Sequence, residues 1–277
     1  MYKTILVHVD ASAGLAARVE LAARMAIAHD AHLVGVAPTG LSAYMYPLSA
    51  MGAGMPPIAF PIEEVRAGAE RSLDLFESGA RQLGVNSLER RMVDEEVGDG
   101  LCLQARYADL VVIGAPAADT VFFARPGVAG HVLLNCARPV LVTPAAGAGG
   151  AIGKRVTVAW NGSAEAVRAI TSALPLLQGA AHVDLVVAGK NGHADLYAEQ
   201  PGADIALYLA RHGVKVDVSM IDGGDDDGES LLSFAARKGA DLIVMGAFGR
   251  SRLREFVLGG ATRTALLSSP IPLWMAH

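Results

Sequence analysis

The chain has 277 residues, more than one domain usually needs, and 52% of them are hydrophobic, so each half is long enough to bury its own core. A net charge of −5 argues against broad electrostatic binding of nucleic acid or of an anionic membrane surface. No uncharged apolar run reaches the roughly 18 residues of a membrane-spanning helix, so we predict no membrane span.

Export is not expected either. The first apolar run, residues 5–9, is closed by Asp10 and is too short for the core of a signal peptide. The only cysteines, Cys102 and Cys136, both fall inside predicted helices. We therefore expect two buried small side chains rather than a disulfide scaffold, and a cytoplasmic location.

The same succession of strands and helices runs through the chain twice. Apolar and β-branched runs predict the strands of the first repeat at residues 5–9, 33–36, 88–93, 110–113 and 139–142. They predict those of the second repeat at residues 156–160, 183–187, 214–220, 242–245 and 270–275. Alternating strands and helices imply right-handed crossovers. The predicted fold class is α/β: two tandem open, parallel five-stranded sheets with helices on both faces and the strand order 3-2-1-4-5.

A helix is expected after the first strand of each repeat. Apolar residues recur there at helical spacing: Leu15, Val19, Ala22 and Ala26, then Val167, Ile170, Leu174 and Leu177. Ser12 and Ser163 precede these helices and are predicted to cap them.

Hydropathy also predicts where some strands lie in the sheet. Residues 110–113 and 242–245 are continuously apolar, as central strands buried on both faces are. Residues 214–220 alternate strictly, which is typical of an edge strand with one wet face. The last strands adjoin Pro139 and Pro270, and proline favours an edge or a peripheral pairing.

The expected domains are residues 1–144 and 154–277. Between them, residues 145–153 consist almost wholly of Ala and Gly and offer few side chains for packing, so they are predicted to form a linker.

In this type of sheet, ligands bind at the carboxyl ends of the strands where the winding direction reverses, here between strands 1 and 4 of each repeat. That rule selects Asp10 with Gly114 in the first repeat and Asn161 with Gly246 in the second.

A glycine-rich segment follows the fourth strand of the second repeat. Gly246 and Gly249 leave the strand, and Gly259 opens a helix after nine further residues. Glycine lets backbone amides approach an anion closely, and a helix N-terminus favours phosphate. Arg250 and Arg252 are candidate phosphate contacts, although a solvated basic loop explains each one equally well.

This segment resembles the G-x2-G-x9-G-(S/T) nucleotide loop of the universal stress protein family, whose members share an adenine nucleotide alpha hydrolase-like, Rossmann-like fold. Gly246, Gly249 and Gly259 match the loop, and Gly260 stands where a serine or threonine is usual. Thr262, two residues on, is a candidate substitute for the missing hydroxyl. The resemblance covers essentially the whole chain, in the tandem form of the family.

The resemblance implies ATP or another adenine nucleotide as ligand, with Mg²⁺ as a candidate companion. Its expected contacts are in the second repeat: Ala159, Trp160, Asn161, Val187, Met245, Gly246, Gly249, Gly259, Gly260, Ala261 and Thr262. Asn161 stands where nucleotide-binding members carry an aspartate, so an acceptor is kept and the charge is lost. Trp160 either borders the base or, by default, belongs to the core.

The first repeat departs further from the loop. Its fourth strand ends in Gly114-Ala-Pro-Ala117, so the second glycine is missing and Pro116 removes an amide donor. A weaker site of Asp10, Gly114 and Gly127 remains, and Asp10 by itself is better explained as a helix cap.

Other polar groups are given structural roles. The acidic run 225–227 precedes a predicted helix. We therefore expect its carboxylates to interact favourably with the helix dipole rather than to form a cation site. His8 lies on the same strand face as Asp10 and is expected to be a satisfied buried histidine. The histidine spacing indicates no metal site. Residues 40–61, present only in the first repeat, suit a lid, a partner surface or disorder.

The expected function is that of a cytoplasmic stress-response regulator that binds adenine nucleotide in its second repeat. No set of residues supplies an evident nucleophile together with a general base, so a dedicated catalyst is not expected. The alternatives are a nucleotide-free interaction scaffold, a slow ATP hydrolase, and an adenylate-forming relative, whose S-G-G-x-D-S loop is absent. The resemblance also implies pseudo-twofold packing of the two repeats through their last strands, and a homodimer of chains is expected.

Overall fold

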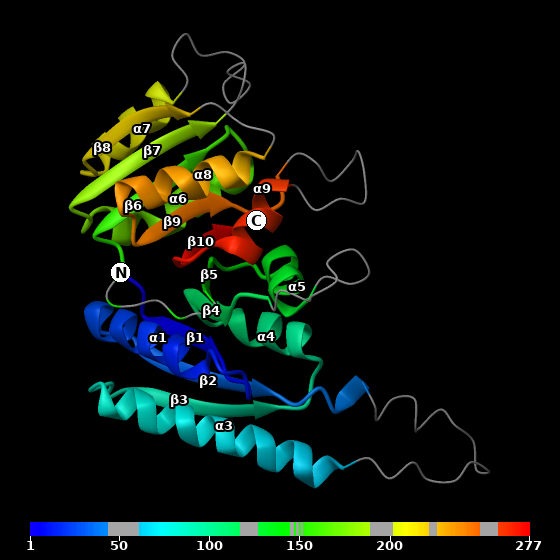
Figure 1. Ribbon diagram of the computed structural model, residues 1–277. Helices are drawn as coiled ribbons and strands as arrows, with labels where there is room; N and C mark the ends of the chain where they lie inside the picture. The colour runs from blue at the N-terminus through cyan, green and yellow to red at the C-terminus, as the bar shows by residue number, and fades with distance from the viewer. Residues whose placement is uncertain are drawn as a thin grey trace. The chain divides into compact units, whose positions relative to one another are not determined.

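The computed structural model describes residues 1–43, 61–116, 127–144, 147, 150, 152–188, 202–221, 226–249 and 260–277. The chain divides into two compact units, residues 2–112 and residues 113–277 with Met1. Figure 1 shows strands alternating with helices along the chain from the blue β1 to the red β10, except that β6 is the next element after β5.

The first unit contains strands and helices in strict alternation. In chain order they are β1 (Thr4–His8), α1 (Leu15–His29), β2 (His32–Pro38), α3 (Ile62–Gln82), β3 (Leu88–Val93), α4 (Val97–Ala105) and β4 (Leu110–Gly114), whose last residues pass into the second unit. β1 pairs in parallel with both β2 and β4, and β2 pairs in parallel with β3.

The second unit continues the pattern. Its elements are α5 (Val128–Asn135), β5 (Val140–Thr143), β6 (Arg155–Trp160), α6 (Ala164–Leu177), β7 (His182–Ala188), α7 (Ala203–Arg211), β8 (Val216–Ile221), α8 (Asp227–Lys238), β9 (Leu242–Gly246), α9 (Gly260–Ser268) and β10 (Leu273–Ala276). β6 pairs in parallel with β7 and β9, β7 with β8, and β9 with β10.

The strand orders are β3-β2-β1-β4-β5 and β10-β9-β6-β7-β8, which confirms the predicted order 3-2-1-4-5 in both repeats. The continuously apolar strands β4 and β9 are central, and the alternating strand β8 is an edge, as expected. The last strands adjoin proline yet are not free edges, because β5 and β10 pair antiparallel with each other, with Leu141 opposite Trp274.

Helices cover both faces of the second sheet. Lys238 at the end of α8 contacts Asp184 of β7 at 2.9 Å. Gly202, which precedes α7, lies against the next residue of that strand, Leu185, and against Val187. Because adjacent strand residues point to opposite faces, α7 and α8 lie on opposite sides of β7.

The two repeats begin with the same backbone clasp. The carboxylate of Asp109, just before β4, accepts hydrogen bonds from the N–H groups of Lys3 and Thr4 at 2.7 and 3.0 Å. Asp241, just before β9, accepts the N–H groups of Lys154 and Arg155 in the same way and that of Gly153 as well. This clasp ties the start of the first strand to the start of the fourth strand in each repeat.

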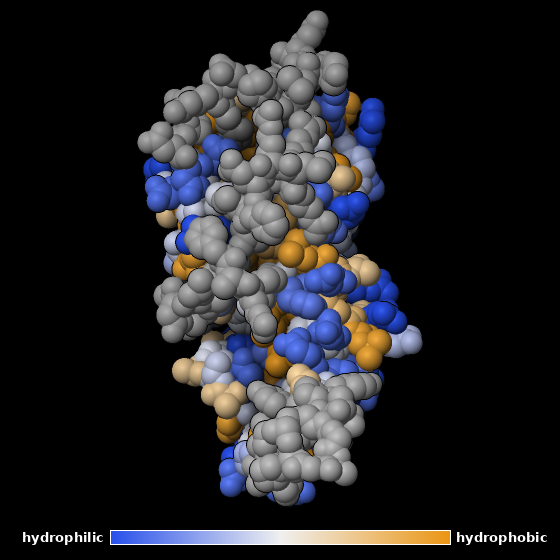
Figure 2. Space-filling view, turned by 90° about the vertical axis from the view of Figure 1, so that its right-hand side faces the viewer, coloured by the Kyte–Doolittle hydropathy of each residue, from blue (hydrophilic) through white to orange (hydrophobic). Residues whose placement is uncertain are grey.

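The cores consist of the inward side chains of these strands with the apolar faces of the helices, and Trp274, Phe76, Ile5 and Leu6 are among the largest fully buried side chains. On the face drawn in Figure 2, hydrophilic and hydrophobic side chains of the described residues lie in small interspersed groups. Cys136 is buried and Cys102 is half-buried. None of the helices in the described part of the chain is long and apolar enough to cross a membrane.

Candidate functional site

The turn that follows β6 is shaped by Asn161 and Ser163. The Asn161 side-chain oxygen accepts the N–H of Ser163 at 3.1 Å, and the Ser163 hydroxyl accepts the N–H of Ala166 at 3.1 Å. Ser163 is therefore the N-cap of α6, as predicted. The N-terminus of α6, which is the positive end of its helix dipole, therefore lies at the carboxyl end of β6.

Gly246 ends β9 directly against the start of α6. A Cβ added there would lie 2.6 Å from the backbone nitrogen of Ala166, a distance that real side chains do not adopt. The absence of a side chain at Gly246 is thus required by packing between β9 and α6. This glycine has a structural explanation that needs no ligand.

Gly249 has a different environment. A Cβ at this position would lie 3.7 Å from the Ser163 hydroxyl, 3.7 Å from a Glu165 carboxylate oxygen and 3.8 Å from the Asn161 amide nitrogen. These are ordinary contact distances, so packing does not demand glycine here. The structure therefore brings Gly249 and Asn161, 88 positions apart in the sequence, to the same strand-end region.

The start of α9 reaches the same region. The Thr262 hydroxyl accepts the backbone N–H of Phe248 at 3.1 Å, which joins the glycine segment after β9 to the first turn of α9. Phe248 adopts a left-handed backbone conformation with φ of 54°, which is uncommon for a bulky residue. A Cβ at Gly260 would meet nothing within 4 Å. The N-termini of α6 and α9 thus converge on Gly249.

The predicted contacts differ in accessibility. Val187 and Met245 are buried, so each can meet a ligand chiefly through its backbone. Thr262 is buried too, and its hydroxyl oxygen already accepts from Phe248, which limits its role as a substitute for the missing serine. Asn161 and Gly260 are exposed, and Ala159, Gly249 and Ala261 are half-buried. The predicted residues Gly259, Arg250 and Arg252 lie outside the described residues.

Trp160 is half-buried at the end of β6, opposite Val187 of β7, and is not a core residue. The default expectation of a core tryptophan is wrong for this position. It holds instead for Trp274, whose side chain is fully buried and whose indole N–H donates to the Ser172 hydroxyl at 3.0 Å.

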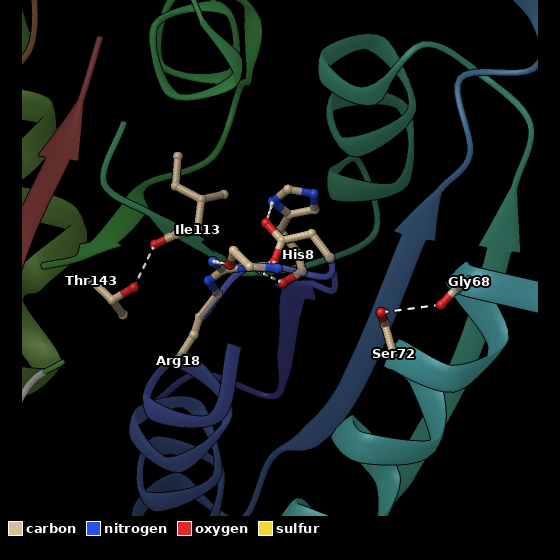
Figure 3. Close-up of polar contacts among 8 residues, drawn as sticks. His8, Arg18, Gly68, Ser72, Ile113 and Thr143 are labelled. Atoms are coloured by element: carbon tan, nitrogen blue, oxygen red, sulfur yellow. Dashed lines mark hydrogen bonds and ion pairs between the residues drawn. The ribbon is translucent and has the colours of Figure 1, made fainter. Parts of the chain in front are cut away.

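In the first repeat, a buried arginine occupies the matching region. The Arg18 side chain on α1 is 3% exposed, donates to the backbone oxygen of His8 at 2.7 Å and to the Ser12 hydroxyl at 3.1 Å, and lies 3.3 Å from the Asp10 carboxylate. Figure 3 shows Arg18 reaching from α1 to His8 at the end of β1. Asp10 is therefore the counter-charge of Arg18.

This role corrects the expected helix caps of the first repeat. α1 begins at Leu15, its N-cap is Gly14, and no side chain caps it. Asp10 instead accepts the N–H of Ser12 at 3.1 Å and the Ser12 hydroxyl at 2.5 Å. Asp10 and Ser12 thus stabilise the turn before the helix, and they line a groove of about 720 Å³ between α1 and α3.

Burial and charge set the protonation of this cluster. Burial lowers the pKa of His8 to about 4, with the Asp10 carboxylate opposing and the Arg18 guanidinium reinforcing that change. Burial alone would raise the pKa of Asp10, but Arg18, then His8, and the Ser12 hydrogen bonds bring it below its usual value. At neutral pH the cluster therefore holds a neutral imidazole beside one ion pair. His8 is buried, as expected from the sequence, and its ring Nδ1 lies 3.6 Å from the Asp10 carboxylate.

Sequence reasoning missed Arg18 and Glu165. The signal was present in the repeats, because a shift of 151 positions aligns the two strand-end turns. That shift pairs Arg18 with Ala169 and Asp10 with Asn161. The first repeat thus carries a positive and a negative charge where the second carries neither.

Gly114 is the last residue of β4, and Gly127 is the N-cap of α5. The backbone N–H of Ala115 donates to the carbonyl of Thr143 in β5 at 2.8 Å, and the Thr143 hydroxyl donates to the carbonyl of Ile113 at 3.0 Å (Figure 3). These bonds extend the pairing between the ends of β4 and β5. The segment after Gly114 therefore has a structural role in the sheet.

The acidic residues lie at the N-terminus of α8, where they were expected to interact with the helix dipole. Asp226 is the N-cap, its carboxylate accepts the N–H of Gly228 at 2.6 Å, and the Thr264 hydroxyl of α9 donates to its other oxygen. Among the described residues, no group of three or more His, Cys, Asp or Glu side chains is placed to hold a metal ion. The predicted loop 40–61 lies mostly outside the described residues, which end at 43 and resume at 61.

Each repeat has the topology of a doubly wound α/β domain whose strand-end turns and helix N-termini meet at the carboxyl edge of the sheet. This is the class of fold that binds small ligands at that edge. The model of the Universal stress protein family matches residues 1–144 and 153–277. The chain belongs to the universal stress protein family, in its tandem two-domain form.

Solved structures share the fold of the whole chain. A universal stress protein from Archaeoglobus fulgidus DSM 4304 is 16% identical, with 99% of this chain and 95% of that chain covered and a TM-score of 0.73. A putative universal stress protein from Pseudomonas aeruginosa UCBPP-PA14 is 14% identical over 99% and 92% of the two chains, with a TM-score of 0.62. These similarities concern the fold.

A further similar structure covers half of the chain. It is the universal stress protein from Archaeoglobus fulgidus in complex with dAMP, 22% identical over 51% of this chain and 97% of that chain, with a TM-score of 0.37. No curated protein sequence matches the chain.

Proposed function

We propose that the second repeat, residues 154–277, binds an adenine nucleotide at the carboxyl ends of β6 and β9, with ATP as the first candidate, and that occupancy regulates partner binding in the cytoplasmic stress response. The observation that carries the proposal is the hydrogen bond from the Phe248 N–H to the Thr262 hydroxyl. It holds the two parts of the glycine segment together beside Asn161, although 14 positions separate the two bonded residues.

The site offers backbone donors and little side-chain charge. Two helix N-termini supply partial positive charge, and Gly249 leaves space where a larger side chain would stand against Ser163 and Asn161. The polar side chain of Asn161, exposed beside Trp160, is suited to a base or ribose. This arrangement favours a phosphate chain near Gly249 and a nucleoside near Trp160.

Among the described residues next to Gly249, Glu165 introduces an opposing charge. Its carboxylate lies 3.7 Å from the position of a Cβ at Gly249, so an unscreened phosphate nearby would be repelled. Mg²⁺ in proteins is commonly held by one or two carboxylates together with substrate phosphates. The donor set therefore fits a magnesium ion that arrives with the nucleotide, with Glu165 as the residue that would hold it. Such an ion would neutralise phosphate charge.

The decisive experiment is calorimetric titration of ATP and AMP, each with and without Mg²⁺, into the full chain and into Gly249→Val. The variant places a branched side chain beside Ser163 and Asn161, and we expect at least a tenfold loss of affinity. Gly179→Val is the matched control, because Gly179 is exposed and follows the opposite end of α6. Thermal unfolding of both variants checks that they fold.

The outcomes separate the competing functions. A wild-type chain that binds no adenine nucleotide would refute the proposal and leave an interaction scaffold. Equal loss of binding in Gly179→Val would show that Gly249 has no special part. Rapid release of phosphate from ATP would instead indicate a hydrolase, for which the described residues offer no evident nucleophile and base at this edge.

A further inference from the structure

β3 in the first repeat and β8 in the second are the outer strands at matching positions, and their edges differ in character. On β3, Arg90 contacts the carboxylates of Asp74 and Glu77 on α3 at 2.9 and 3.1 Å, and Arg91 contacts that of Glu89. Charged side chains along an edge discourage pairing with another chain, because pairing would remove them from water. β3 is therefore a protected edge.

β8 lacks this protection. Its sequence, VDVSMI, carries one charged residue, and its apolar side chains Val218 and Met220 are 45% and 55% exposed. Along its length β8 is paired in parallel with β7 on one side only. In the described part of the chain, its outer N–H and C=O groups thus form a row without a neighbouring strand, which is a template for pairing.

Helices α7 and α8 approach β8 from opposite faces, and in the described part of the chain its outer edge has no neighbouring strand. A Cβ added at Gly202, just before α7, would lie 3.4 Å from the Val218 side chain on one face. On the other face, Lys238 of α8 reaches Asp184, the register partner of Asp217. Val218 and Met220 nevertheless stay 45% and 55% exposed, and a strand added beside β8 would cover part of their flanks.

We propose that β8 pairs antiparallel with β8 of a second copy of this chain, centred on Val218, and so joins the sheets of two molecules. In this register each Val216 lies opposite Met220 of the second copy, and Val218 lies opposite itself. All three side chains point to the same face, so the half-exposed apolar stripe of one strand meets that of the other.

The charge on the strand selects both the partner and the register. Centring the pair on Asp217 would set two carboxylates directly opposite each other, which is destabilising. Centring it on Val218 places each Asp217 opposite Ser219 instead. The strand is thus complementary to itself in the register that also buries the most apolar surface. This dimer does not depend on nucleotide binding.

Mass measurement in solution tests the dimer. Light scattering during size exclusion should give the wild-type chain twice the 28.7 kDa of one copy. Val218→Lys sets two ammonium groups opposite each other and should shift the mass to that of the monomer. Val167→Lys is the matched control, because Val167 is 42% exposed on α6 and lies outside the strand. A monomeric wild type, or a dimeric Val218→Lys, would overturn the proposal.

Disulfide trapping tests the register and remains informative if Val218→Lys does not fold. Opposite residues of an antiparallel pair have Cβ atoms about 4.5–5.5 Å apart, so Val218→Cys should cross-link to its own copy under mild oxidation. Met220→Cys should not, because its opposite residue is Val216, and Val167→Cys serves as a second control. Cross-linking at position 220 in preference to 218 contradicts the register, and none at either position contradicts the β8 interface.

Discussion

The substitution Asp10→Asn tests whether the main role of Asp10 is to neutralise the charge of the Arg18 guanidinium. The amide keeps an oxygen that can accept the Ser12 N–H and hydroxyl, so the local turn is preserved. What it removes is the negative charge 3.3 Å from a guanidinium whose side chain is 3% exposed. The substitution therefore separates the electrostatic role of Asp10 from its hydrogen bonds.

The expected cost follows from the burial of the two partners. Removing one member of a fully buried ion pair costs about 3–5 kcal/mol, because the other charge stays buried without compensation. The Asp10 side chain is 31% exposed, so water already screens part of the interaction. We therefore expect Asp10→Asn to lower the free energy of unfolding by about 2 kcal/mol, below the fully buried range.

Equilibrium unfolding in urea, followed by circular dichroism, measures this loss for Asp10→Asn, Arg18→Ala and the double variant. The double variant reproduces Asn161 and Ala169 of the second repeat and leaves no lone charge. It should therefore be more stable than the sum of the single losses predicts, by about 1–2 kcal/mol. Arg24→Ala on the exposed side of α1 is the control, with an expected loss of about 0.5 kcal/mol. Additive single losses would refute the reasoning.

Four further predictions concern single positions. The free energy of unfolding should fall by about 3 kcal/mol as the pH is lowered from 6.5 to 4. In this range His8 takes up a proton in the unfolded chain but not in the folded chain, where its pKa is about 4. Urea unfolding of His8→Ala at the same pH values should show a smaller fall. Gly246→Ala should destabilise the chain by about 1–3 kcal/mol in thermal and urea unfolding, whereas Gly249→Ala should leave stability nearly unchanged. Gly260→Ser places a hydroxyl in open space at the start of α9 and should raise nucleotide affinity about fivefold in calorimetry; an unchanged affinity would mean that no phosphate lies there. Asp241→Ala removes the acceptor of three backbone N–H groups and should cost about 2–3 kcal/mol, measured against Asp241→Asn as the milder control.

The fold was predictable because each level of the sequence agrees with the others. The continuous apolar runs of β4 and β9 and the alternation of β8 encode burial on two faces and on one, and burial decides a strand's place in the sheet. The repeat then supplied the same topology twice. Pairing between the last strands was beyond local patterns, because the prolines at 139 and 270 only restrict which backbone groups can pair.

The candidate site was less predictable, because its determinants are contacts across the sequence. A glycine required by packing, Gly246, and one that packing does not require, Gly249, look alike in the sequence. Arg18 lies in a helix where an arginine is ordinarily solvent-exposed, and only the fold turns its side chain inward to Asp10. The residue propensities therefore predicted the turn and the helix, but they assigned the N-cap to Ser12, whereas the N-cap of α1 is Gly14.

The antiparallel pairing of β5 with β10 has a consequence for synthesis on the ribosome. β5 ends at Thr143, and its partner β10 begins only at Leu273, after the other strands of the second repeat. Throughout translation of the second repeat, that side of β5 has no strand to pair with. Non-local pairing of this kind forms slowly, and unpaired strand edges promote aggregation. β10 is thus the strand that covers this edge of β5 once it has been synthesised.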